Sequence, residues 1–160
     1  MNKIAFREKS GDWIYYLTWF TYKEVSLYVK RIDKELHQSK SLNDMIQRSL
    51  TDNVDKIASY IEKQPERFFN ALVLAVYDGD PQWREVELDY GQGEKYDLGI
   101  LEFNGEEKIF PVDGQHRVEG IKRVIDRNSD EKYELETIPV ILIGHKKTSA
   151  GMQRTRRLFS

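Results

Sequence analysis

Apolar and polar residues recur along the chain with a period that changes from strand-like to helix-like. Residues 13–19 are dense in aromatic and β-branched side chains, which predicts a strand. Thr21 and Glu24 then have the spacing of a capping box, in which the hydroxyl and the carboxylate bind the first free amides of a helix. Apolar residues follow at helical spacing, so we expect a helix from Tyr22 to about His37.

A second helix and a buried strand are expected after a polar stretch. Thr51 or Asp52 can cap the start of this helix, and Pro65 ends it because proline has no amide hydrogen to donate. The nearly continuous apolar run that comes next predicts a buried strand over residues 71–77, preceded by a helical turn. Residues 78–96 are acidic and rich in turn formers, so we expect a turn-rich insertion there.

The pattern then predicts a β-hairpin. Two apolar runs, 98–103 and 106–112, flank the dipeptide Asn104-Gly105. This dipeptide favours a type I′ turn, because both of its residues tolerate the positive φ that such a turn requires. We therefore expect the two runs to pair with each other.

The last part of the chain predicts a strand, a helix and another strand. The strand that ends at Val112 leads into a helix with Val118, Ile121 and Val124 on one face, and residues 138–143 form a further apolar strand. The predicted fold class is α+β, a small mixed sheet with packed helices. The length of 160 residues fits a single domain over residues 1–160.

The turn between the predicted strand and helix carries the residues best suited to chemistry, Asp113-Gly114-Gln115-His116-Arg117. A helix that starts in such a turn offers free amides and the positive end of its dipole to an anion. Gly114 permits close backbone approach, and Arg117 is a planar cation suited to phosphate oxygens. Gln115 and His116 can donate or accept a hydrogen bond, and Asp113 can hold a hydrated Mg²⁺ beside phosphates. The alternatives are structural: Asp113 as an N-cap, Gly114 as a turn residue, a structural histidine and a solvent-facing arginine.

Charge is distributed unevenly although the net charge is only −2. The segment from residue 145 to residue 160 contains no acidic residue, which suits contact with DNA phosphates, although a solvated terminus would have the same composition. Its predicted DNA-binding residues are Lys146, Lys147, Arg154, Arg156 and Arg157.

Several classes of protein and of site are excluded or disfavoured. The chain has no cysteine, so it has no disulfide, thiol nucleophile or zinc–thiolate site. The longest apolar runs, near 71–76 and 138–143, are too short to cross a bilayer, and the N-terminus lacks the pattern of a signal peptide. We expect a cytoplasmic protein with no membrane partner.

The sequence from Val112 to Arg117, followed by a helix and an apolar strand, resembles the defining motif of the DGQHR-domain family. That family includes DndB-like proteins of bacterial DNA phosphorothioation systems and is similar to the ParB and sulfiredoxin group, so the resemblance implies a fold of that kind. It also implies nucleotide or phosphate contact for Gly114, Gln115, His116 and Arg117. Members usually continue beyond the Arg-Arg-Leu-Phe-Ser segment, so we expect this chain to be a C-terminally truncated form.

These observations lead to two main hypotheses. In the first, a protein linked to DNA modification or defence binds a nucleoside triphosphate with Mg²⁺, or a DNA phosphate, at the loop; Asp113 holds the metal, and His116 or Gln115 orients a water or substrate oxygen. It would then be an NTPase or a nuclease. In the second, the protein is a non-catalytic DNA-binding transcriptional regulator of a phosphorothioation-type operon. The implied partners are DNA, nucleotide and other DNA-modification proteins.

Overall fold

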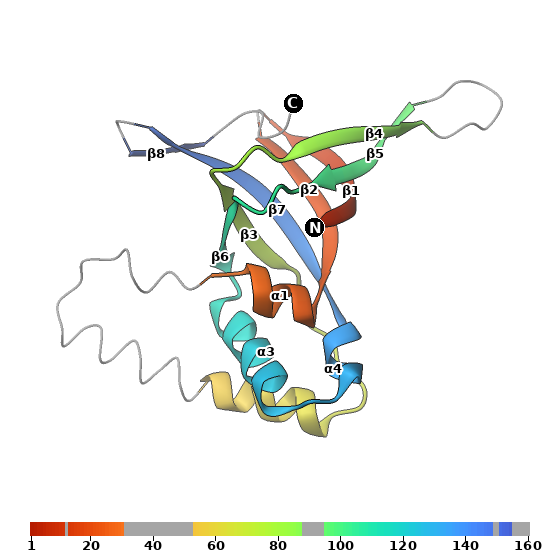
Figure 1. Cartoon of the computed structure of the whole chain (residues 1–160), viewed down its shortest axis with the longest axis vertical. Coiled ribbons are helices and arrows are strands. Elements are labelled where there is room, and N and C mark those ends of the chain that lie inside the picture. Colours follow the sequence, from red (N-terminus) through yellow and green to blue (C-terminus); the bar gives the residue numbers. More distant parts are fainter. Residues whose placement is uncertain (12, 31–52, 88–94, 149–150, 155–160) are drawn as a thin grey trace.

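One mixed sheet, with helices gathered at one end of it, makes up the part of the chain that the structure describes (Figure 1). The structure is a computed structural model, and it describes residues 1–11, 13–30, 53–87, 95–148 and 151–154. Its strands are β1 (Asn2–Ser10), β2 (Trp13–Thr21), β3 (Leu72–Tyr77), β4 (Gln82–Glu87), β5 (Lys95–Glu102), β6 (Lys108–Asp113), β7 (Thr137–Thr148) and β8 (Gly151–Arg154). Its helices are α1 (Tyr22–Tyr28), residues 53–63, α3 (Gln115–Arg127) and α4 (Glu131–Leu135). This arrangement confirms the predicted α+β class.

The strands are ordered β4-β5-β1-β2-β7-β3-β6, and β8 pairs with the far end of β7. All neighbours are antiparallel except β3 and β7, which run parallel. The expected unit of strand, helix and strand is present as β6, α3 and β7, but β3 lies between the two strands. Parallel strands cannot be joined by a tight hairpin and need a long crossover connection. The chain between β3 and β7 provides such a connection, which includes α3 and α4.

The core lies along one face of the sheet, against the helices at one end and, at the other, where Tyr16 of β2 packs on Trp83 of β4 with ring centroids 5.3 Å apart. Tyr16 and Phe20 of β2 point into it, whereas Trp19, between them in the alternation, is 43% exposed. Some of the aromatic residues of β2 are therefore buried in the core, and others face outward. The described residues contain no helix that is both long and apolar enough to cross a membrane.

The helix α1 starts where the sequence predicts and ends much earlier. Both bonds of the capping box are present, from Glu24 N to Thr21 Oγ1 at 3.1 Å and from Thr21 N to Glu24 Oε1 at 2.9 Å. The helix ends at Tyr28 because the next residue, Val29, adopts an extended conformation and bridges to Ile109 of β6. The prediction of a continuous helix to His37 is therefore wrong at Val29, and residues 31–37 lie outside the described part.

One expectation for the centre of the chain is wrong. The runs 98–103 and 106–112 do not form a hairpin: β5 pairs with β1 and β4, and β6 pairs with β3. Gly105 has φ +93° but Asn104 does not have positive φ, so the turn is not type I′. The turn-rich insertion expected over 78–96 includes β4, which pairs with β5.

The second helix is confirmed over residues 53–63, while its predicted caps Thr51 and Asp52 lie outside the described residues. The strand expected over 71–77 is β3, largely buried. The helical turn expected before it is absent, because residues 67–71 have no regular structure.

Candidate functional site

The DGQHR loop, residues 113–117, begins with a bulge in the edge strand β6. Val73 of β3 is opposite Asp113, whereas the next residue, Leu74, is opposite Pro111. Val112 is therefore the extra residue, and a bulge of this kind bends the strand where it ends. Gln115 stabilises the bulge, because its Nε2 donates to the backbone oxygen of Val112 at 3.1 Å.

Gly114 turns the chain from the strand into α3. It is the N-cap residue and has φ +96°, a conformation that favours glycine. A β-carbon at this position would lie 2.5 Å from Leu72 Cδ2 and 2.9 Å from Arg117 Nη2. Only glycine fits without displacement here. The alternative of Asp113 as the N-cap is therefore wrong.

Arg117 lies against the loop instead of extending into solvent, and its side chain is only 17% exposed. Its Nη1 donates to the backbone oxygen of Asn70, with a longer contact of 3.4 Å to that of Ala71, just before β3. Its Nη2 lies 3.7 Å from Asp113 Oδ2. Arg117 thus joins α3, the end of β6 and the start of β3, and it keeps a positive charge beside the loop.

The start of α3 retains free hydrogen-bond donors. No side chain caps it, and its first turn contains no acidic residue. The first intrahelical bond runs from Val118 N to Gly114 O at 2.9 Å, so the amides of Gln115, His116 and Arg117 precede the helical ladder. His116 is half-buried and the Asp113 carboxylate is 72% exposed. The loop therefore presents amides, an imidazole and a carboxylate, while Gly114 itself is buried.

Metal-binding groups are sparse around this loop. Within the described ranges, no three histidine or acidic side chains come together as a metal cluster. Asp113 has the exposure that a ligand of a hydrated Mg²⁺ needs, and Mg²⁺ is commonly held by one or two carboxylates together with substrate phosphates. Asp113 thus fits a metal that arrives with phosphate.

The described part of the predicted basic segment, residues 145–148 and 151–154, lies away from the loop (Figure 1). Lys146 and Lys147 belong to β7, and the antiparallel register with β8 brings Arg154 opposite His145. These residues therefore share a two-stranded ribbon, while Arg156 and Arg157 lie outside the described part. Asp113 is level with Ile141 through Val73, so Lys147 lies six residues, or roughly 20 Å, further along the sheet. The structure thus separates the two predicted surfaces.

The structure also reveals a groove that the sequence did not predict, with a volume of about 420 Å³. It lies between the segment before β3 and the start of β7, and its lining includes Tyr22, Arg67, Phe68, Phe69, Leu135 and Glu136. Arg67 forms an ion pair with Glu136 and donates to the backbone oxygens of Ile61 at 2.7 Å and Gln64 at 2.6 Å. The groove is built from three separate stretches of chain, so only the pair Phe68-Phe69 ahead of a buried strand could have drawn attention to it.

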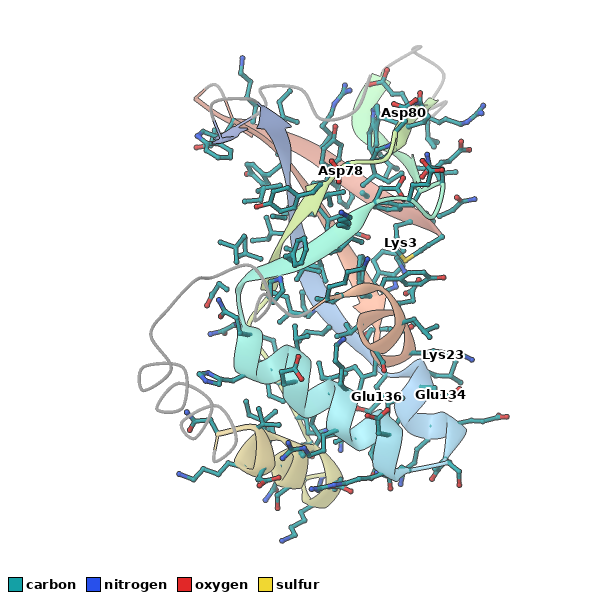
Figure 2. All side chains as sticks on the ribbon, turned by 60° about the vertical axis from the view of Figure 1, so that its left-hand side comes forward. Lys3, Lys23, Asp78, Asp80, Glu134 and Glu136 are labelled. Carbon is teal, nitrogen blue, oxygen red and sulfur yellow. The ribbon has the colours of Figure 1, made fainter. Side chains whose placement is uncertain are left out.

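Burial and charge alter the acidity of groups in this groove. Burial, followed by the neighbouring negative charge of Glu136, raises the pKa of Tyr22 to about 12. Burial tends to lower the pKa of Arg67, but its hydrogen bond and charge interaction with Glu136 outweigh this and raise it. The groove therefore holds a neutral phenol beside a charged pair. Figure 2 shows Glu136 near the helical end, opposite the end where Asp78 and Asp80 mark the turn after β3.

Comparison with known proteins gives a family but no individual relative. No curated protein and no solved structure matches the chain significantly. Residues 4–160 match the protein family DndB, described as DNA-sulfur modification-associated, and this match covers nearly the whole chain and includes the DGQHR loop. The chain therefore belongs to the DndB family of DNA-sulfur modification-associated proteins.

Proposed function

We propose that the DGQHR loop binds a phosphate group of a nucleotide or of DNA, in a protein that acts in DNA sulfur modification. The observation that carries the proposal is the uncapped start of α3, where three amides precede the helical ladder and no acidic residue occupies the first turn. Oriented amides and the helix dipole favour an anion at this position. The family's association with DNA modification makes a nucleotide or DNA phosphate the relevant anion.

The residues of the loop have different parts in this proposal. Gly114, Gln115 and Arg117 fix the turn through the contacts described above, and the Arg117 charge attracts the anion. His116 binds a phosphate oxygen or orients a water against it, and Asp113 holds Mg²⁺ that arrives with a triphosphate. If turnover occurs, it is NTP hydrolysis or DNA nicking.

Binding of ATP, GTP and CTP, each with Mg²⁺, and of a short DNA duplex tests the proposal in wild type and His116→Ala. Loss of a hydrogen bond to a charged group costs about 1.5–3 kcal/mol, so we expect affinity to fall roughly tenfold or more. Lys23→Ala is the control, because Lys23 is an exposed cation on α1, paired with Glu134 at 3.5 Å (Figure 2). Phosphate release and nicking of supercoiled DNA are measured on the same samples. Equal binding by wild type and His116→Ala, or none by either, would refute the proposed role of the loop.

A second candidate function is favoured by the β7–β8 ribbon. Two-stranded ribbons can enter a DNA groove, and this one contains Lys146, Lys147 and Arg154. On this proposal the protein is a non-catalytic DNA-binding regulator, with the loop as a scaffold. Its duplex binding would weaken steeply with salt, and reversing the charge of Lys146, Lys147 and Arg154 together would reduce the salt slope. An unchanged slope would exclude the ribbon as the DNA contact.

A further inference from the structure

We propose that the groove beside β3 binds a nucleobase whose phosphate is held at the DGQHR loop. The base belongs either to a free nucleotide or to an unpaired nucleotide of DNA. This inference rests on the proposed function, because it gives the base of the same nucleotide whose phosphate is proposed to bind at the DGQHR loop. The residues of the groove differ from those of the loop, so the base site and the phosphate site can be tested separately.

Phe68 gives the groove a stacking surface. Its side chain is 79% exposed, which is unusual for an aromatic residue that could have packed into the core. The neighbouring Phe69 is held in place by an edge-on contact with Tyr60, with ring centroids 5.5 Å apart. An exposed aromatic ring on a fixed segment is the feature on which proteins stack nucleic acid bases, because every base has a π-face.

The polar groups of the groove suit the edge of a base. Glu136 uses Oε1 to accept from Arg67, which leaves its second oxygen for a donor such as a ring N–H or an exocyclic amine. Tyr22 closes the inner side of the groove as a neutral phenol, and it is only 2% exposed. A planar ligand with a donor on its edge, such as a nucleobase, matches the second oxygen of Glu136.

Size and position also fit a nucleotide. The groove volume of about 420 Å³ lies within the range of small-ligand pockets. The groove adjoins the start of β7, and the loop adjoins the end of β6, on either side of the start of β3. Two strand spacings, about 10 Å, and two residues along β7, roughly 7 Å, separate Asp113 from Pro139 of the groove, so the two places lie roughly 12 Å apart. One nucleotide with an extended phosphate chain spans a distance of this order. Arg117 ties the two places together, since it binds the carbonyl of Asn70, next to Phe69.

The test uses the full chain and fluorescently labelled single-stranded oligonucleotides, one of mixed sequence and one of the same length with an abasic backbone. Phe68→Ala removes the stacking ring at an exposed position, so the fold is retained. Leu27→Ala is the matched control, because Leu27 is a 64% exposed apolar residue on α1 outside the groove. We expect Phe68→Ala to weaken binding of the mixed oligonucleotide between about fivefold and 100-fold and to leave the abasic one unchanged. Phe68→Trp restores binding.

The outcomes separate the two proposals. If both oligonucleotides bind alike, or if Phe68→Ala behaves as Leu27→Ala does, the base groove is refuted, while sensitivity to His116→Ala would still support the phosphate site. If free nucleosides bind in a Phe68-dependent way and His116→Ala affects no probe, the groove stands and the phosphate site falls. Absence of binding by nucleosides, nucleotides and both oligonucleotides refutes both. Tighter binding of the mixed strand than of a mononucleotide identifies DNA as the source of the base.

Discussion

Replacing Gly114 by alanine tests whether the DGQHR loop is packed as tightly as the structure shows. The substitution has two costs. Alanine at φ +96° is strained by about 1–2 kcal/mol, and the new β-carbon would lie 2.5 Å from the fully buried Leu72. Overpacking of that kind costs typically about 1–3 kcal/mol.

We therefore expect Gly114→Ala to lower the free energy of unfolding by about 2–5 kcal/mol. For a chain of this length, each kcal/mol corresponds to roughly 2–4 °C in Tm. Domains have typically about 5–15 kcal/mol of stability, so the loss takes up a large share of the total and is easily measured. Urea and thermal unfolding followed by circular dichroism measure the change.

Two other glycines separate the two costs. Gly105 has φ +93° but a β-carbon added there would meet nothing within 4 Å, so Gly105→Ala carries backbone strain alone, about 1–2 kcal/mol. Gly120 lies inside α3, where a β-carbon would meet Ile57 Cγ2 at 2.4 Å, so Gly120→Ala carries the packing cost alone, offset by about 1 kcal/mol of helix propensity. If Gly114→Ala destabilises no more than Gly105→Ala, the close contact with Leu72 is wrong.

Two further predictions concern α1. The pKa of Tyr22 is about 10 in the unfolded chain and about 12 in the folded protein, so the phenol is neutral in both states below pH 10. Above pH 10 the unfolded chain loses this proton first and therefore binds fewer protons than the folded protein. The free energy of unfolding should then fall by about 2–3 kcal/mol between pH 10 and 12. Urea unfolding across this range should show the loss in wild type but not in Tyr22→Phe, and identical pH profiles would contradict the raised pKa. Thr21→Ala removes one hydrogen bond of the capping box and should lower the free energy of unfolding, measured with urea, by about 1 kcal/mol. Thr21→Ser keeps the hydroxyl and should retain most of this stability. An equal loss of stability in both variants would exclude the hydroxyl as the cap.

The two halves of the proposed nucleotide site differ in how far the sequence could predict them. The turn that carries the DGQHR residues is confirmed between β6 and α3, because its signal is local: a strand, a glycine and the start of a helix within a few residues. The partners of Arg117 were not predicted, because Asn70 and Ala71 are more than 40 residues away in sequence. An arginine expected to face an anion directly is instead largely buried against backbone oxygens.

The failed hairpin shows why pairing is harder to predict than strand formation. Asn104-Gly105 favours a turn, and a turn does form, with Glu107 accepting from the amides of Asn104 and Gly105 at 2.9 Å each. The strands on either side nevertheless pair with β1, β4 and β3, which lie elsewhere in the chain. A turn sequence constrains a few dihedral angles, whereas the choice of strand partner depends on the burial of whole faces.

The sequence by itself determined which segments form β2, β3, α3 and β7, where α1 begins, and which loop carries the DGQHR residues. These features depend on contacts between residues within about one turn or one strand. The tertiary structure alone decided that α1 ends at Tyr28, that Arg117 holds the start of β3, and that Phe68 and Glu136 share a groove. Each of these depends on a partner from a distant part of the chain, and such partners are selected by the packing of the whole core, which local periodicity does not encode.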